Sequence, residues 1–389
     1  MQFAKRLDRL PPYLFVDINR RIADMRARGI DIVTFAIGDP DMPTPEHIID
    51  RLCREAHVPV NHRYPETDGL PELHEAIAEW YRGRFDIDLD PETEVLPLIG
   101  SKEGIGHIAF CFVEPGCTVL VPDPGYPVYS MATMIAGGQP HYMPLVEANN
   151  YLPDFGAIPD SVLSRTRLMW LNYPNNPTGA GATLDFFNEA VAFARAHDIA
   201  ICHDAPYTEV YFEGVRPPSF LQADGAKEVG VEFHSLSKTY HMTGWRIGMV
   251  VGNKDMLRAL FTVKSNLDSG IPQAIQLMAV EALRGPQTVV AEHNEVLQRR
   301  RDNLLQVLGE IGLHARKPDG TFYVWAEVPE GYSCVDLARE LLEQVHVAVT
   351  PGIGYGASGA NHIRFSITLP DDRLDEGVRR LAKWRGGAR

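Results

Sequence analysis

The stretch Ser235-Leu236-Ser237-Lys238-Thr239-Tyr240-His241-Met242-Thr243-Gly244-Trp245-Arg246-Ile247-Gly248 is the most informative part of this chain. It sets two serine hydroxyls beside Lys238, with Arg246 eight residues further on, between two apolar runs. Ser235 and Ser237 are two residues apart, so on an extended segment they face the same way and Lys238 points away from them. A lysine amine can bond covalently to an aldehyde, and serine and arginine side chains can bind phosphate. The stretch therefore predicts a site for a ligand that carries both an aldehyde and a phosphate.

Pyridoxal phosphate (PLP) carries those two groups, and we expect Lys238 to hold it. The alternative is a surface turn in which Lys238 is merely solvated, as most lysines are. Features elsewhere in the chain favour the cofactor.

Length and composition limit the class of protein. A chain of 389 residues with 45% hydrophobic residues is expected to form two globular domains with a large core. The formal net charge of -14 argues against a nucleic-acid partner. Five scattered cysteines without a CxxC pair indicate reduced thiols in the cytoplasm. We expect no metal site because the histidines lack ligand spacing, and no secretory signal or membrane span.

Short apolar runs alternate with amphipathic segments through the first two thirds of the chain. Such alternation predicts an α/β fold with a mostly parallel sheet covered by helices on both faces. The expected strands are Val95-Ile99, Thr118-Val121, Arg167-Leu171, Ile199-His203, Val231-His234 and Ile247-Val251.

The pattern changes near Gly270, where long helical segments lead into strands at Thr321-Glu327, Val347-Val349 and Ile363-Thr368. This part is expected to be a smaller α+β domain. Residues 10–37 are too few to fold alone, so we expect them to cross over and pack on it. The expected division is an N-terminal arm with part of the small domain at 1–37, a large domain at 38–285 and a small domain at 286–389.

Several polar residues follow the expected strands. Gly100-Ser101-Lys102 opens a helix, where free backbone N–H groups can bind phosphate, although Ser101 could simply be an N-cap. Asp204 ends a buried strand, and a carboxylate there needs a cation such as a protonated pyridine nitrogen. The alternatives for Asp204 are a helix N-cap or a structural ion pair.

Four more side chains are candidates for contact with the same ligand. Tyr126 lies in a rigid Pro-Gly turn that could present its ring for stacking, and Asn176 lies in a turn dense in Asn and Pro. Tyr207 follows Asp204 by three residues and could reach the phenolic oxygen of the ring. Arg364 could clamp a carboxylate with its planar fork. For each residue alone, an ordinary loop or surface role stays open.

Together these residues resemble, in order and spacing, the class I/II PLP-dependent aminotransferases over nearly the whole chain. Other stretches resemble the LL-diaminopimelate aminotransferases more closely. These are Leu10-Pro11-Pro12-Tyr13-Leu14-Phe15, Ile37-Gly38-Asp39-Pro40-Asp41, Asn61-His62-Arg63-Tyr64-Pro65, Leu96-Pro97-Leu98-Ile99-Gly100-Ser101-Lys102-Glu103-Gly104 and Lys264-Ser265-Asn266-Leu267-Asp268-Ser269-Gly270.

The resemblance implies a fold-type I transferase with a mostly parallel seven-stranded sheet in its large domain. It implies that Lys238, Asp204 and Tyr207 are catalytic, with Lys238 as the covalent anchor and proton carrier. The implied cofactor-binding residues are Ser101, Lys102, Tyr126, Asn176, Asp204, Tyr207, Ser235, Ser237, Lys238, Arg246 and Tyr64. The implied substrate-binding residues are Arg364, Asn176, Tyr13, Gly38, Lys102, Tyr126 and Asn266. The Asn176-Pro177 bond is expected to be cis, as in relatives.

The resemblance further implies a cytoplasmic homodimer in which Tyr64 and Asn266 reach into the partner's site. The implied reaction transfers an amino group between LL-diaminopimelate and 2-oxoglutarate, in lysine biosynthesis. The alternatives are an aspartate, alanine or broad-range aminotransferase, a PLP-dependent β-eliminating lyase, and a non-catalytic PLP-binding regulator.

Overall fold

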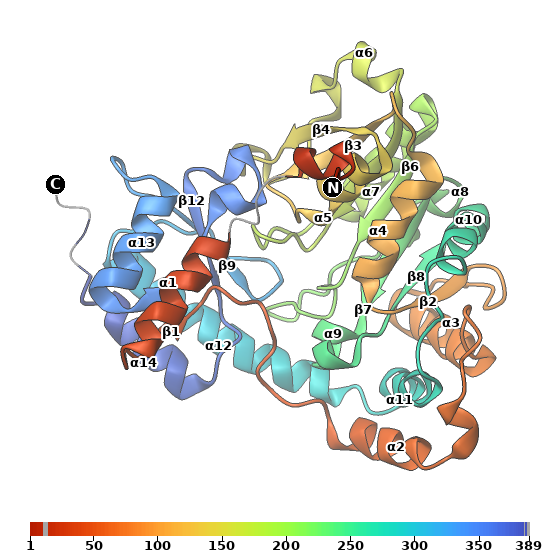
Figure 1. The fold of residues 1–389 in the computed structure, drawn as a ribbon, viewed down its shortest axis with the longest axis horizontal. Coiled ribbons are helices and arrows are strands. Elements are labelled where there is room, and N and C mark those ends of the chain that lie inside the picture. The colour runs from red at the N-terminus through yellow and green to blue at the C-terminus, as the bar shows by residue number, and fades with distance from the viewer. Residues whose placement is uncertain (11–14, 385, 387–389) are drawn as a thin grey trace.

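The computed structural model describes residues 1–10, 15–384 and 386 (Figure 1). Its main sheet has seven strands in the order β2-β8-β7-β6-β5-β3-β4. The antiparallel strand β8 lies between β2 and β7, and the other neighbouring strands are parallel, which confirms the expected mostly parallel sheet. The strands are β2 Val95–Leu98, β3 Thr118–Asp123, β4 Gln139–Pro144, β5 Thr166–Asn172, β6 Ala200–Asp204, β7 Gly230–Ser235 and β8 Gly248–Gly252.

The sequence pattern missed β4. This strand lies at the edge of the sheet and most of its side chains are at least partly exposed, so it lacks a continuous apolar run. An edge strand with a solvated face carries a weaker hydrophobic signal than a strand buried on both faces.

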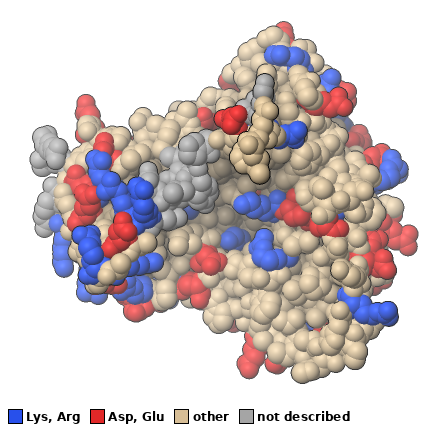
Figure 2. All heavy atoms as spheres, viewed as in Figure 1, with Lys and Arg blue, Asp and Glu red and all other residues tan. Residues whose placement is uncertain are grey.

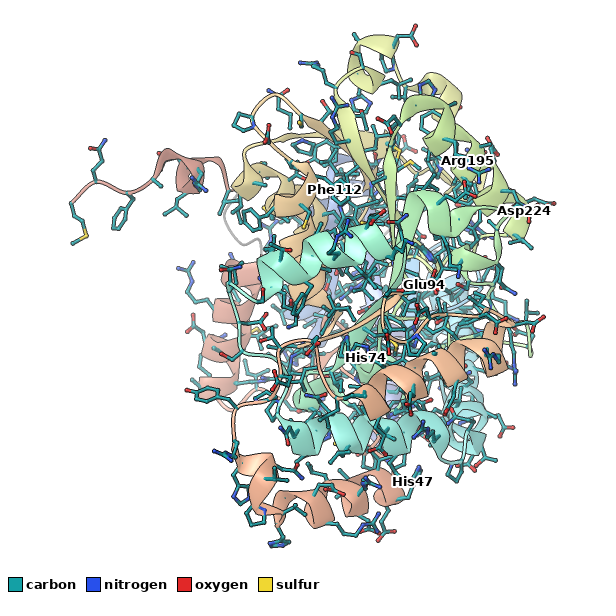
Figure 3. All side chains as sticks on the ribbon, turned by 90° about the vertical axis from the view of Figure 1, so that its right-hand side faces the viewer. His47, His74, Glu94, Phe112, Arg195 and Asp224 are labelled. Carbon is teal, nitrogen blue, oxygen red and sulfur yellow. The ribbon has the colours of Figure 1, made fainter. Side chains whose placement is uncertain are left out.

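Alternating side chains of the strands enter two separate cores, one on each face of the sheet. Trp170 packs in the same cluster as Ile105 of α4 and Leu260 of α10, whereas its neighbour Met169 packs with Ile77 of α3 and residues of α7 and α11. In Figure 3, His47 on α2 and His74 on α3 mark helices of this second side, and Phe112 marks α4 of the first. The α-helices of this part of the chain, on both faces of the sheet, are α2 Glu46–Ala56, α3 Pro71–Phe85, α4 Ser101–Phe112, α5 Val128–Ala136, α6 Asp160–Leu163, α7 Leu184–His197, α8 Ala226–Val229, α9 Leu236–Thr239, α10 Lys254–Lys264 and α11 Gln273–Arg284.

A third large core forms around the antiparallel sheet β11-β12-β9 in the C-terminal part (Figure 1). Val33 and Phe35 from the N-terminal part belong to this core, and β1 pairs with β10 through Val33 and Val347. The elements are α1 Phe15–Ala27, β1 Val33–Thr34, α12 Thr288–Glu310, β9 Tyr323–Glu327, α13 Cys334–Val345, β10 Val347–Ala348, β11 Thr350–Pro351, β12 His362–Ser366 and α14 Asp371–Leu381.

The carboxyl ends of the parallel strands place polar residues at one edge of the main sheet. Asn172 ends β5, Asp204 ends β6 and Ser235 ends β7, and these three strands are neighbours. Ligands of open α/β sheets bind at this edge. Figure 2 shows a hollow between the two lobes of the molecule in which Lys and Arg side chains gather. Among the described residues, no helix combines the length and the apolar character needed to cross a membrane.

Candidate active site

A cavity of about 500 Å³ opens at the carboxyl edge of the main sheet, next to the small sheet. It collects most of the residues that the sequence singled out. The predicted residues that line it are Gly38, Ser101, Lys102, Tyr126, Asn176, Asp204, Tyr207, Ser235, Ser237, Lys238, Arg246 and Arg364.

Lys238 lies in the short helix α9, directly after β7. The expectation that Ser235, Ser237 and Lys238 share an extended segment is wrong, because only Ser235 belongs to the strand. Ser235 caps α9 instead, and its hydroxyl accepts a hydrogen bond from the backbone N–H of Ser237 at 3.2 Å. All three residues nevertheless line the cavity.

The amine of Lys238 is partly buried and donates a hydrogen bond to the carbonyl oxygen of Gly38 at 3.1 Å. Burial lowers the pKa of Lys238 to about 8, and Arg246 and Arg364 act in the same direction, opposed by Asp39. A lysine with a pKa near 8 has a sizeable neutral, nucleophilic fraction near neutral pH, unlike a solvated lysine.

His234, on β7, connects the segments that carry Asp204 and Lys238. Its Nδ1 donates to the carbonyl oxygen of Ala205 at 2.8 Å, and its Nε2 accepts from the hydroxyl of Thr239 at 3.3 Å. Burial lowers the pKa of His234 to about 4, so the ring stays neutral and can donate on one side and accept on the other.

Gly38 occupies a position that no other residue could fill without a shift of its surroundings. A Cβ atom there would lie 2.0 Å from the hydroxyl oxygen of Tyr323. The glycine therefore lets the backbone approach both Tyr323 and Lys238.

Asp204 is 4% exposed and has one satisfied and one unsatisfied carboxylate oxygen. Its Oδ2 accepts a hydrogen bond from the hydroxyl of Tyr129 at 2.6 Å, whereas its buried Oδ1 has no partner among the described residues. Burial raises the pKa of Asp204 to about 6, and the hydrogen bond from Tyr129 opposes the shift. Neither alternative for Asp204 fits, because it ends a strand without capping a helix and forms no ion pair within the described part of the chain.

Tyr129 is a functional candidate that the sequence reasoning missed. It is fully buried, stacks on Trp170 with ring centroids 4.7 Å apart, and meets the edge of Tyr126 at 5.8 Å. The local signal was its position in the first turn of α5, three residues after Tyr126, which precedes that helix.

The turn before α4 and Arg246 form a second polar group in the cavity. Gly100, not Ser101, is the N-cap residue of α4, so the N-cap reading of Ser101 is wrong and its hydroxyl is not used in capping. Gly100 has a φ of 71°, and a Cβ there would lie 2.3 Å from Nη2 of Arg246. The guanidinium thus packs directly on the turn that presents the first N–H groups of α4, an arrangement suited to an anion.

Arg364 of β12 projects from the small sheet into the cavity. Its Nη1 donates to Oδ1 of Asn176 at 2.9 Å and its Nη2 to the carbonyl oxygen of Ala36 at 3.1 Å, while its buried Nε has no partner within the described residues. The guanidinium lies between the rings of Tyr323 and Tyr355, 3.9 and 4.8 Å from their centroids. The two rings fix its plane by cation–π contact.

Tyr323 and Tyr355 were also missed by the sequence reasoning. Tyr323 lies 3.3 Å from Tyr207, hydroxyl to hydroxyl, and so connects the two sheets at the cavity. Burial raises the pKa of Tyr207 well above its usual value, which keeps this phenol protonated. Both missed tyrosines reach the site only through packing of the small sheet, so local sequence carried no signal for them.

Asn176 is held in place by the neighbouring strand ends. Its backbone N–H donates to Oδ1 of Asn172 at 2.9 Å, and Nδ2 of Asn172 donates to the carbonyl oxygen of Asp204 at 2.7 Å. The Asn176-Pro177 bond is cis, as expected.

Two predicted residues that the structure describes, Tyr64 and Asn266, do not reach the cavity within this chain. Tyr64 is 88% exposed, Asn266 is also exposed, and neither lines the cavity. Tyr13 lies outside the described residues.

The chain matches the family model for aminotransferase class I and II over residues 30–381. It is 59% identical to an LL-diaminopimelate aminotransferase from Dehalococcoides mccartyi over 388 residues, which cover 100% of both chains. It is 45% identical to an LL-diaminopimelate aminotransferase from Aquifex aeolicus, over 98% of both chains.

Solved structures with the same fold include substrate-bound BacF from Bacillus subtilis, with a TM-score of 0.94 and 37% identity over 98% of both chains. A mutant aspartate aminotransferase from Thermus thermophilus has a TM-score of 0.91 and 29% identity, over 98% of this chain and 99% of that chain. Sequence, fold and the arrangement of the cavity agree, and the chain belongs to the class I and II aminotransferases and is an aminotransferase.

Proposed function

We propose that this aminotransferase holds PLP through Lys238 and transfers an amino group between LL-diaminopimelate and 2-oxoglutarate, in lysine biosynthesis. The observation that carries the chemistry is the buried, unpartnered Oδ1 of Asp204 in the same cavity as the amine of Lys238. The choice of substrate is supported by the relatives of 45% to 59% identity that carry the name LL-diaminopimelate aminotransferase.

The lining of the cavity fits PLP, the cofactor that the family implies. A buried carboxylate oxygen without a donor suits the protonated ring nitrogen of PLP. The hydroxyls of Ser101, Ser235 and Ser237, together with Arg246 and the start of α4, suit a phosphate. Tyr126 offers a ring for stacking, and Lys102 and the partner's copy of Tyr64 complete the proposed cofactor contacts. When bound, PLP supplies an electron sink for the substrate Cα.

Lys238 is the proposed proton carrier of the reaction. Its amine must be neutral to accept a proton from the substrate Cα, and a pKa of about 8 leaves about one tenth of it neutral at pH 7. The carbonyl oxygen of Gly38 orients this amine within the cavity.

Asp204 would keep the ring nitrogen of bound PLP protonated by holding a negative charge beside it. The hydrogen bond from Tyr129 stabilises that charge and leaves Oδ1 free to face the ligand. Tyr207 and Asn176 both lie on the wall of the cavity and would hold the phenolic oxygen of the cofactor.

Arg364 is proposed to bind the α-carboxylate of the substrate. Among the described residues, Asn176 and Ala36 each accept a hydrogen bond from its guanidinium, which has further N–H groups for two parallel hydrogen bonds to a carboxylate. Gly38 contributes backbone, and Asn176, Lys102, Tyr126 and Tyr13 are the other proposed substrate contacts within the chain.

The exposed positions of Tyr64 and Asn266 support a homodimer in which each chain lends these residues to its partner's site. The five free cysteines support a reducing, cytoplasmic location. The proposed domains are residues 38–285, around the main sheet, and residues 286–389 together with residues 1–37.

A panel of amino donors tests the substrate. We expect LL-diaminopimelate to give the highest kcat/KM with 2-oxoglutarate, with glutamate formed in equal amount. A higher kcat/KM for aspartate or alanine would replace the proposed substrate but keep the reaction. Release of ammonia and a 2-oxo acid without consumption of 2-oxoglutarate would identify a lyase instead.

A further inference from the structure

One charged cluster lies outside the cavity and has no role in the proposed chemistry. Lys264, the last residue of α10, has a side chain that is 0% exposed. Its ammonium contacts Oε2 of Glu103 at 3.2 Å and Oδ1 of Asp268 at 2.8 Å. A buried ammonium is costly unless it is paired, so these contacts hold both carboxylates close to it.

Glu103 connects this cluster to the proposed phosphate end of the cavity. Its Oε2 also accepts a hydrogen bond from the backbone N–H of Ile99 at 3.0 Å, and its Oε1 contacts Nδ1 of His107 at 2.9 Å. Ile99 and Glu103 enclose the turn that carries Ser101 and Lys102. The position of Glu103 therefore fixes that turn.

Asp268 connects the same cluster to the exposed segment that carries Asn266. Its Oδ1 accepts a hydrogen bond from the backbone N–H of Gly270 at 2.9 Å. Gly270 in turn packs on the segment next to Tyr64, because a Cβ there would lie 2.9 Å from the carbonyl oxygen of Glu66.

Without the ammonium of Lys264, the carboxylates of Glu103 and Asp268 would face one another without the positive charge that both now contact. Ligand atoms of Glu103, His107 and Asp268 lie within 4.8 Å of one another, a spacing that could suit a cation. The ammonium of Lys264 already contacts both carboxylates and supplies the positive charge. If the charge of Lys264 were removed, the carboxylates of Glu103 and Asp268 would repel one another, because their ligand atoms lie within 4.8 Å and water screens them little.

We infer that Lys264 is a positioning residue that fixes the phosphate-binding turn of its own chain relative to the two segments offered to the partner subunit. This inference rests on the proposed shared active site. Loss of the Lys264 charge would change the working site of the same chain through residues 99–103, and the site of the partner through residues 64–67 and 266–270.

Mixed dimers separate the two effects. In each mixed dimer, the first chain carries Lys238→Ala and the second chain keeps Lys238. The only working site of the dimer then uses Lys238 of the second chain and Asn266 of the first. With Lys264→Met placed in the first chain, we expect the KM for LL-diaminopimelate at the working site to rise about tenfold. With Lys264→Met in the second chain, we expect the dissociation constant of PLP, from an absorbance titration, to rise about tenfold.

Lys254→Met is the matched control, because Lys254 is an exposed lysine at the start of the same helix. It should change neither constant by more than about twofold. Hydrogen exchange of the holoenzyme should become faster in residues 99–103 and 264–270 for Lys264→Met only. If that variant does not fold, Asp268→Asn keeps the lysine and should raise the KM in the partner's site to a smaller extent.

Asn266→Ala in the first chain tests separately whether that chain contributes Asn266 to the working site of the second. If Asn266→Ala raises the KM of the working site and Lys264→Met in the same chain does not, the inference is wrong and the shared site stands. If Asn266→Ala has no effect on the partner's site, the shared site is wrong, and the inference falls with it. A general loss of thermal stability with unchanged KM and PLP affinity would also overturn the positioning role.

Discussion

The two ends of the proposed active site are built in opposite ways. At the cofactor end, Asp204 and Tyr207 are 4% and 5% exposed, and hydrogen bonds within the chain fix Asp204. At the other end, Tyr64 is 88% exposed and Asn266 lies on the surface. Buried charges and dipoles act strongly because the surroundings screen them little, whereas exposed groups are screened by water. The single chain thus preorganises the groups proposed for the chemistry, whereas the proposed homodimer would leave part of substrate recognition to contact with a second copy.

The strongest test of the buried end is removal of its amine. Lys238→Ala should lower the rate of glutamate formation from LL-diaminopimelate and 2-oxoglutarate by about 10⁴-fold, because it removes both the covalent anchor and the proton carrier. Lys254→Ala, on the surface of α10, should leave the rate unchanged. Turnover within tenfold of the parent enzyme would contradict the role of Lys238.

The buried carboxylate comes next. Asp204→Asn should lower kcat about 10²-fold, since a buried charge pair of about 3 kcal/mol is lost, while PLP still binds. An absorbance titration measures the binding and steady-state assays measure the rate. Asp185→Asn, an exposed change on α7, is the control. A near-normal kcat in Asp204→Asn would refute the assignment.

Arg364 separates substrate recognition from cofactor binding at the buried end. Arg364→Lys should lower kcat/KM about 10- to 100-fold, because a lysine loses the bidentate fork, worth about 1.5–3 kcal/mol. The dissociation constant of PLP should stay within about twofold of the parent value. Equal losses in both quantities would show that Arg364 supports the whole cavity rather than the carboxylate alone.

Substitution at the exposed end should lower activity less than substitution at the buried end. A second chain that carries the intact residue should restore the lost activity. Asn266→Ala should raise the KM about tenfold in the homodimer. Random mixing of Asn266→Ala with Lys238→Ala chains should restore about a quarter of the parent activity, since half of the dimers are mixed and each has one intact site. No restoration after mixing would mean that each chain builds its whole site alone.

Removal of the Tyr129 hydroxyl should have the smallest effect on kcat, because it acts only through the charge on Asp204. Tyr129→Phe should lower kcat about fivefold at neutral pH, which corresponds to a net hydrogen-bond contribution of roughly 1 kcal/mol. The hydroxyl lowers the pKa of Asp204, so its removal moves that pKa further above about 6 and protonates the carboxyl over a wider pH range. The acid limb of the pH–rate profile should therefore shift to higher pH, and superimposable profiles would count against the role.

Local patterns predicted much of the fold. The apolar runs of β2, β3, β5, β6, β7 and β8 were found because strands buried on both faces leave a continuous signal. The edge strand β4 was missed for the opposite reason. The serine pair before Lys238 lines the same cavity as that lysine, although Ser237 lies in a helical turn and not on the extended segment that the sequence predicted.

By itself, the sequence determined the residues that follow strand ends, such as Asp204 and Lys238, because parallel strands bring their carboxyl ends to one edge whatever the details of packing. Only the tertiary structure decided that Tyr129 holds Asp204, that Tyr323 and Tyr355 enclose Arg364, and that Lys264 is buried between two acids. Apart from Lys264 and Asp268, which are four residues apart, those contacts join side chains from different elements. Their partners depend on how helices and sheets pack in space, and no local spacing encodes that packing.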